Sequence, residues 1–254
     1  MPFKTSLGET IFKQKYASNA YETWEDRVRL VVNWVCGDMD GDKNNLMAKS
    51  DRDELTQYIS EFKFMPGGRY LWYSGRDARF FNNCYLLRLE DDSREEWAGL
   101  SQRAMSCLMT GGGIGVDVSV CRPSGRQLRR TGGVASGPIP LLHTLNEIGR
   151  NVMQGGSRRS ALYGSMNWQH EDAKHLLSAK NWHEMHLGKQ KEYTVADMKK
   201  LDFNYAAPLD MMNISLNYDD DWLNGGGDNI FKENCRQAMM TGEPGFSFNF
   251  GDKQ

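Results

Sequence analysis

Apolar residues change their spacing near residue 65, and this change divides the chain into a helical first part and a mixed second part. A helix is expected from Asp53 to Ile59, with Ser50 or Asp51 as its N-cap. An earlier helix is predicted by apolar residues that recur every three or four positions, namely Trp24, Val28, Val31, Val32 and Val35.

Five short apolar runs after residue 65 predict β-strands, with helical patterns between most of them. The runs are Cys84–Leu89, Ile114–Val120, Ala161–Asn167, Met212–Leu216 and Phe246–Phe250. Two intervening helices each keep one apolar face, formed by Trp97, Leu100, Ala104 and Leu108 and by Leu141, Leu145, Ile148 and Val152. Crossovers of this length join parallel strands, so the pattern predicts an α/β fold.

Two further segments are polar. The segment from Gln169 to Asp210 is expected to be helical or loop-like, and the one from Asp219 to Asn229 a surface connection. The last predicted strand ends four residues before the end of the sequence. That arrangement is typical either of a sheet cut in the middle or of a small domain with an edge strand.

Composition narrows the class of protein. Hydrophobic residues make up 39% and charged residues 25% of 254 residues, as in soluble globular proteins. A net charge of −2 gives no reason to expect a nucleic acid or an acidic membrane as partner. No apolar run approaches the ~20 residues of a membrane span, and no signal peptide is recognisable, so we expect a cytoplasmic protein with five thiols.

Three glycine-rich segments join predicted helices and strands: Thr110-Gly-Gly-Gly-Ile-Gly115, Thr131-Gly-Gly-Val-Ala-Ser-Gly-Pro138 and Gln154-Gly-Gly-Ser-Arg-Arg-Ser160. Such turns can present backbone N–H groups to an anion, and adjacent arginines add phosphate donors. None has the glycine spacing of a P-loop or of a Rossmann fingerprint. Each alone is typical of a tight turn, whereas three within about 50 residues favour a phosphate-bearing ligand.

The remaining candidates for chemistry are a cysteine, a histidine cluster and an acidic loop. Cys84 begins a predicted strand, where it either packs as a small apolar residue or faces a pocket. His183 and His186 lack a metal-binding pattern and are expected on a polar surface helix. The loop from Asp38 to Asn44 has Lys43 where a calcium loop needs glycine, so we expect a solvated turn and no metal site.

Six segments in this order resemble the large subunit of the ribonucleotide reductases over about residues 60–254. They are Phe64-Met-Pro-Gly-Gly-Arg-Tyr-Leu-Trp-Tyr-Ser-Gly75, Asn82-Asn-Cys84, Gly111-Gly-Gly-Ile-Gly115, Thr131-Gly-Gly-Val-Ala-Ser-Gly-Pro138, Gly155-Gly-Ser-Arg-Arg-Ser160 and Gly242-Glu-Pro-Gly245. Pro66-Gly-Gly-Arg-Tyr-Leu-Trp72 and Ser157-Arg-Arg-Ser160 look most like the adenosylcobalamin-dependent class II enzymes.

The resemblance implies a helical N-terminal region over 1–60, followed over 61–254 by the first five-stranded half of a ten-stranded α/β barrel. In the family, an Asn-x-Cys-x-Glu segment after this half carries the radical cysteine, and this sequence contains no such segment. We therefore expect the chain to need a C-terminal half, without which it is inactive. The implied cofactors and partners are adenosylcobalamin, a nucleotide effector, a ribonucleotide substrate, a thioredoxin-like or glutaredoxin-like reductant and a second copy of the chain, because the helices at 97–109 and 139–153 match those of a dimer interface.

The resemblance also implies roles for individual residues. Cys84 corresponds to the first cysteine of the reducing pair. The substrate would be lined by Gly67, Gly68, Arg69, Asn83 and Gly113. The loop that sets base specificity would comprise Gln154, Gly155, Gly156, Ser157, Arg158, Arg159, Ser160 and Ala161. The effector would lie near Asp91, Arg129, Arg130, Gly132 and Gly133.

Two alternatives stay open at this point. The chain could belong to a class I large subunit, which a separate subunit supplies with a radical. It could instead be a non-catalytic nucleotide-binding regulatory protein that keeps the glycine-rich loops.

Overall fold

The computed structural model describes residues 3–37, 47–128, 132–152, 160–188 and 192–251. The chain forms two compact units, Met1–Asn83 and Cys84–Gln254. The expected turn at Asp38–Asn44 lies outside the described residues. In the described ranges, no helix has the length and apolar composition to cross a bilayer.

The first unit is helical, as its sequence predicts. Its helices are α1 (Ser6–Lys15), α2 (Trp24–Cys36), α3 (Lys49–Ser60) and α4 (Gly68–Tyr73). Thr23 and Asp26 form a capping box at the start of α2, and Gly37 ends that helix in the left-handed conformation. The expected N-cap of α3 is wrong, because the helix begins at Lys49 after Ala48, so Ser50 and Asp51 lie in its first turn.

A buried arginine ties residues after 60 to the N-terminal helices. Arg27 on α2 is fully buried; it pairs with Glu22 at 2.7 Å and donates to the carbonyl of Ser74 at 3.2 Å. Leu71 packs in the same apolar cluster as Trp24 and Val28. Residues 61–83 therefore group with the first unit in the structure, and the assignment of 61–254 to one barrel half stays a prediction.

The second unit contains a five-stranded parallel sheet, as predicted. Its strands are β1 (Cys84–Leu87), β2 (Gly113–Asp117), β3 (Leu162–Asn167), β6 (Met212–Tyr218) and β7 (Gly245–Phe248), hydrogen-bonded in this order. All five predicted strands are confirmed, with ends shifted by up to three residues. The strand β7 lies at the edge of the sheet.

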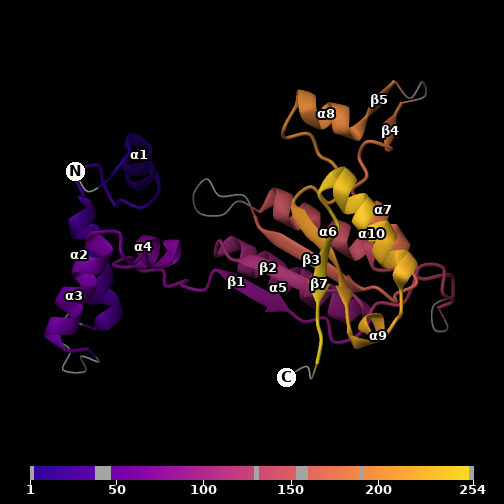
Figure 1. Ribbon diagram of the computed structural model, residues 1–254, viewed down its shortest axis with the longest axis horizontal. Helices are drawn as coiled ribbons and strands as arrows, with labels where there is room; N and C mark the ends of the chain where they lie inside the picture. The colour runs from indigo at the N-terminus through magenta and orange to yellow at the C-terminus, as the bar shows by residue number, and fades with distance from the viewer. Residues whose placement is uncertain (1–2, 38–46, 129–131, 153–159, 189–191, 252–254) are drawn as a thin grey trace. The chain divides into compact units, whose positions relative to one another are not determined.

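Helices between the strands cover one face of the sheet (Figure 1). They are α5 (Arg94–Met109), α6 (Ile139–Asn151), α7 (Ala173–Ser178), α9 (Asp220–Leu223) and α10 (Asp228–Thr241). Leu100, Ala104 and Leu108 on α5 are fully buried against Ile114 and Val116 of β2 and their neighbours. This face forms the main apolar core of the unit.

One of the expectations for the polar segments is wrong. His183 lies in a turn and His186 opens β4 (His186–Leu187), which pairs with β5 (Tyr193–Thr194) in a short hairpin before α8 (Val195–Leu201). These strands of two residues are too short to show a periodic pattern. The segment from Asp219 to Asn229 is a surface connection between β6 and α10, as expected, and it contains the short helix α9, which the Asp219 carboxylate caps by accepting from the N–H of Trp222.

Glycines allow α6 to approach β3 closely. A Cβ atom built on Gly149 of α6 would lie 2.4 Å from Cδ1 of Leu162, too close for any real contact. By contrast, a Cβ atom on Gly99 of α5 would meet only the flexible end of Arg103, at 3.3 Å. The two helical glycines therefore differ in whether packing requires them.

We predict that Gly149→Ala lowers the free energy of unfolding by about 1–3 kcal/mol, because the added methyl group overpacks the helix against the sheet. The matched variant Gly99→Ala should raise the free energy of unfolding by up to about 1 kcal/mol, since alanine has a higher helix propensity than glycine. Urea unfolding of both variants measures the difference. Equal effects would contradict the close packing of α6 on β3.

Candidate functional site

The face of the sheet opposite the helices, which we call the open face, carries small and polar side chains. Strand β6 alternates strictly, with Met212, Ile214, Leu216 and Tyr218 in the core and asparagine or serine between them. The members of the open face are Cys84, Leu86, Gly113, Gly115, Asp117, Tyr163, Ser165, Asn167, Asn213, Ser215, Asn217, Gly245 and Ser247. Parallel strands sealed on both sides are apolar throughout, so this alternation indicates a face that lines a polar space.

Cys84 and Gly113, both predicted site residues, lie side by side at the start of this sheet. They are register partners at the first positions of β1 and β2. Cys84 is exposed, whereas Cys36 and Cys121 are buried and Cys107 and Cys235 are half-buried. The expectation that Cys84 opens a strand is confirmed, and its thiol lies on the open face.

Burial makes the thiols of Cys121 and Cys107 unreactive. It raises the pKa of Cys121 to about 12, with the carboxylates of Asp92 and Asp117 adding to the effect. Burial also raises the pKa of Cys107 on α5. Because only the thiolate reacts readily, both cysteines suit a structural role.

The predicted specificity loop ends beside the same edge of the sheet. The carbonyl of Ala161 accepts a hydrogen bond from the N–H of Ile114 at 2.9 Å, so it meets β2 next to Gly113. Ser160 is buried, and its hydroxyl has no partner in the described part of the chain. The remaining loop residues, Gln154 to Arg159, lie outside the described residues.

Four predicted substrate residues belong to the first unit. Gly67 precedes α4, which begins at Gly68, and the Asn83 amide would lie 3.6 Å from a Cβ atom on Gly67. Arg69 is 5% exposed and donates to the carbonyl of Phe80 at 2.8 Å. Gly67, Arg69 and Asn83 thus belong to one unit, and Asn83 directly precedes Cys84, the first residue of the other unit. Their role in binding substrate stays a prediction.

The described effector candidates lie in the loops that follow β1 and β2. Asp91 is exposed, and Gly132 and Gly133 have positive φ angles of 71° and 79°. A groove of about 1670 Å³ lies between these loops, lined by residues 92–95, Trp97, Arg122 and residues 126–128 and 134–137. Among the lining residues, Arg122 forms an ion pair with Asp92 at 2.5 Å. Arg129 and Arg130 lie outside the described residues.

Hydrogen bonds link polar groups of the open face toward the carboxyl ends of the strands. The Asp117 carboxylate accepts from the hydroxyl of Ser165 at 3.4 Å and from the amide of Asn217, two strands away. Asn167 donates to Asp219 at 2.9 Å. All of these residues except Ser165 line a cavity of about 360 Å³, together with Leu86 and Ser119. Sequence reasoning missed this network, because its members are up to 100 residues apart.

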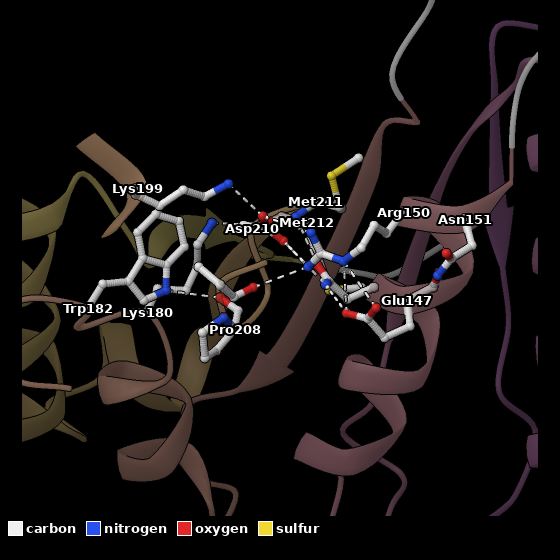
Figure 2. A network of polar contacts seen from close by, with 12 residues as sticks. Glu147, Arg150, Asn151, Lys180, Trp182, Lys199, Pro208, Asp210, Met211 and Met212 are labelled. Carbon is white, nitrogen blue, oxygen red and sulfur yellow. Dashed lines mark hydrogen bonds and ion pairs between the residues drawn. The ribbon is translucent and has the colours of Figure 1, made fainter. Parts of the chain in front are cut away.

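A buried carboxylate fixes the start of β6, as Figure 2 shows. Asp210 accepts from Arg150 of α6 at 2.5 Å and from Lys199 of α8 at 2.7 Å, and its side chain is 3% exposed. Burial opposes its ionisation, but the hydrogen bonds and charges of Arg150 and Lys199 outweigh burial and lower its pKa to about 2. The charged carboxylate therefore stabilises the fold.

Lys180 fixes the backbone at the start of β6. Its ammonium group donates to the carbonyl of Met212 at 2.8 Å and pairs with Glu243 at 2.8 Å. Glu243 in turn accepts from the N–H of Ile214 at 3.2 Å. The backbone of β6 on both sides of Asn213 is therefore fixed from outside the sheet.

Comparison with known proteins relates the chain to one family. Residues 82–222 match the family described as "Ribonucleotide reductase, barrel domain". The chain is 33% identical over 128 residues to the vitamin B12-dependent ribonucleoside-diphosphate reductase of Mycobacterium tuberculosis, covering 50% of this chain and 18% of the relative. It is 33% identical over 113 residues to the ribonucleoside-diphosphate reductase large subunit of Danio rerio, covering 43% and 14%. The matches thus span less than a fifth of these relatives.

Among solved structures, the fold is similar to the Actinobacillus ureae class Id ribonucleotide reductase alpha subunit. The TM-score is 0.68, with 15% sequence identity, and the match covers 96% of this chain and 40% of that chain. At this identity the likeness concerns the fold alone. It agrees with the five parallel strands expected for part of a barrel.

We predict that Asp210→Asn lowers the free energy of unfolding by about 2 kcal/mol at pH 7. The folded pKa of Asp210 is about 2 and its ordinary value is 3.8, so its contribution is complete above about pH 5 and is lost as the pH falls. By pH 3 the difference from wild type should shrink to about half. Urea unfolding at pH 7, 5 and 3 measures it.

The matched control is Glu233→Gln on α10. Hydrogen bonds from Arg236 and Gln237 also lower the pKa of Glu233 to about 2, but its side chain is 39% exposed. Solvent screens such a pair, so this variant should change stability by less than about 0.5 kcal/mol. A pH-independent loss in Asp210→Asn would show that the carboxylate acts by shape rather than by charge.

Proposed function

The chain belongs to the ribonucleotide reductase barrel-domain family, and from this premise we propose that it is part of an enzyme that converts ribonucleotides to 2′-deoxyribonucleotides. Exposed Cys84 beside Gly113, at the start of a five-stranded parallel sheet with a polar open face, is the observation that carries the proposal. By the resemblance, Cys84 is the first cysteine of the reducing pair and Gly113 lines the substrate. Both roles fit a cytoplasmic enzyme to which this chain supplies one reducing thiol.

The proposed reaction replaces the ribose 2′-OH by hydrogen. This step consumes two electrons, which a pair of thiols supplies by closing to a disulfide, and the hydroxyl leaves as water. We assign Cys84 as one thiol of the pair and place the other on the C-terminal half of the same enzyme. A thioredoxin-like or glutaredoxin-like protein then reduces the disulfide and restores both thiols.

The radical source that we propose is adenosylcobalamin. A vitamin B12-dependent reductase is among the relatives of the chain, at 33% identity over 128 residues, and supports this choice. Cobalamin brings its own ligands to cobalt, so it needs no cluster of protein donors; the described ranges contain no group of three or more His, Cys, Asp or Glu suited to a metal ion. Bound in the complete enzyme, it would supply the radical by homolysis of its cobalt–carbon bond.

We further propose that a nucleotide effector occupies the groove between the loops after β1 and β2. Asp91, Arg129, Arg130, Gly132 and Gly133 would contact it, and Gln154–Ala161 would relay its identity to the substrate. Arg122 and Arg126 line the groove and are suited to an anionic phosphate chain. Two positive-φ glycines in the same loop allow close approach to a ligand.

A homodimer through α5 and α6 completes the proposal. Met105 and Met109 lie four residues apart on α5 and are 41% and 59% exposed. Exposed methionines on one helix face are typical of a surface that packs against a partner. The alternative, a non-catalytic nucleotide-binding protein, leaves the exposed strand-end thiol without a role.

We expect the chain, combined with a polypeptide that supplies the radical cysteine, to form deoxyribonucleotide in the presence of adenosylcobalamin and a dithiol. The product is measured by chromatography of labelled ribonucleotide. No product with cobalamin, but product with a class I radical-generating subunit, would favour the class I alternative. No product with either would refute the reductase proposal.

In the same reconstituted enzyme, Cys84→Ser should abolish multiple turnover while leaving effector binding intact. Serine cannot form the disulfide that delivers the second electron. Cys107→Ser is the matched control, since Cys107 is half-buried on α5 and should keep its turnover rate. Continued turnover by Cys84→Ser would exclude Cys84 from the reducing pair.

A further inference from the structure

The loop after β2 forms a short hairpin, which we call the groove hairpin, with residues 121–128 and 132–137 as its described arms. Two backbone hydrogen bonds join the arms: the N–H of Gly125 donates to the carbonyl of Ala135 at 2.9 Å, and the N–H of Ala135 donates to the carbonyl of Arg126 at 2.8 Å. More than half of the residues that line the groove between the loops after β1 and β2 belong to these arms. The groove hairpin therefore sets the shape of the proposed effector site.

A buried carboxylate lies where the two arms of the groove hairpin meet. The Oδ2 atom of Asp172, whose side chain is 5% exposed, accepts from the N–H of Ser124 in the first arm at 2.8 Å. Gly137 ends the second arm, and a Cβ atom on it would lie 2.8 Å from the same oxygen. This close approach and a φ angle of 79° both favour glycine at 137. One carboxylate oxygen thus contacts both arms at their base.

Asp172 makes these contacts instead of capping its own helix. It is the N-cap residue of α7, where an aspartate ordinarily accepts from N–H groups of the first turn, but its side chain makes no such bond. At the same position of α9, Asp219 does cap its helix. The second oxygen of Asp172 bonds Nδ1 of His175 at 3.0 Å. A residue that served only α7 would cap it, so the orientation of this carboxylate indicates a role in the groove hairpin.

His170 adds a second contact to the same hairpin. Its Nε2 atom lies 2.8 Å from the carbonyl oxygen of Cys121, and its Nδ1 atom accepts from the N–H of Asp172 at 3.0 Å. The neutral ring with its proton on Nε2 makes both bonds. Neither His170 nor Asp172 is among the described residues that line the groove. Both therefore affect the groove through the hairpin and without touching a ligand in it.

We propose that Asp172 is a positioning residue for the nucleotide effector, with His170 as its support. It fixes the base of the groove hairpin, so that Arg122 and Arg126 are held in place before the phosphate chain arrives. A loop that is ordered in advance binds more tightly, because less conformational freedom is lost on binding. The inference rests on the proposed effector site and adds to it two residues that no ligand contact would reveal.

The test compares Asp172→Ala and Asp172→Asn with wild type. The probe is thymidine triphosphate, a 2′-deoxyribonucleotide like the proposed product, titrated by calorimetry into the full chain and into the reconstituted enzyme. Asp172→Ala should raise its Kd about five- to thirtyfold. Asp172→Asn should keep the Kd within about twofold, because the asparagine oxygen can accept from Ser124 and its amide can donate to Nδ1 of neutral His175.

Amide hydrogen exchange measures the hairpin without any ligand. In Asp172→Ala, the N–H groups of Gly125 and Ala135 should exchange at least about tenfold faster than in wild type, because the base of the hairpin opens more often. The N–H groups of β3 and β6 should keep their exchange rates. This contrast separates a local change in the hairpin from unfolding of the whole unit.

The matched control is Asp197→Ala. Asp197 also accepts two hydrogen bonds in the same unit, both from Thr194, but it caps α8 and is not among the described residues that line the groove. This variant should lose stability and keep the wild-type Kd.

A second pair of variants decides the question if Asp172→Ala fails to fold. His170→Ala removes the bond to Cys121 and should raise the Kd about three- to fivefold. His183→Ala, in an exposed turn, should leave the Kd unchanged.

The possible failures are distinguishable. If wild type binds no thymidine triphosphate in either form, the effector site is refuted and the inference with it, whereas the reductase proposal is tested separately by product formation. If wild type binds the nucleotide and the folded Asp172→Ala and His170→Ala variants keep the Kd within about twofold, the inference alone is wrong. A rise in Kd that Asp197→Ala shares, or that Asp172→Asn does not recover, also overturns it, because lost stability or lost charge would then explain the effect.

Discussion

The packing of one sheet face against the helices is the interaction on which the rest of this structure depends. Leu100, Leu108, Leu141, Leu142 and Leu145 are each at most 1% exposed beneath the sheet. Burying side chains of this size stabilises a fold by about 1.5–3 kcal/mol each. Because the apolar core lies on this face, the opposite face does not have to be apolar. It can then hold serines, asparagines, glycines and one thiol.

The freedom of the open face explains how one sheet combines stability with chemistry. Along each strand, residues of the open face alternate with residues of the core, so each strand contributes to both faces. Strand β2 buries Ile114 and Val116 and presents Gly113 and Gly115 on the other side. Gly113 is the register partner of Cys84, so β2 places no side chain directly beside the thiol. The same strand therefore contributes apolar side chains to the core and glycines to the open face.

The sequence predicted the architecture because helices and strands of useful length leave periodic signals. Five parallel strands and the helices around them follow from apolar spacing, and Cys84 at a strand start follows from the same pattern. The β4–β5 hairpin escaped, since two residues per strand cannot show a period. The Asp117–Ser165–Asn217 network also escaped, because hydrogen bonds between side chains 48 to 100 residues apart depend on strand order, which periodicity does not give.

The two asparagines on the open face of β6 illustrate what the pattern could have revealed. Met212-Asn-Ile-Ser-Leu-Asn-Tyr218 alternates apolar and polar residues through a strand at the middle of a parallel sheet, where continuous apolar sequence is the norm. That departure alone indicates a polar space beside the strand. Distinguishing Asn213 from Asn217 needed the structure, because the two asparagines are equivalent in the pattern and differ only in their partners. Asn217 is bonded to Asp117 and Ser165, whereas Asn213 has no described partner and lies beside Tyr163. An asparagine engaged in the fold holds strands together, whereas an exposed one without a protein partner bonds to water.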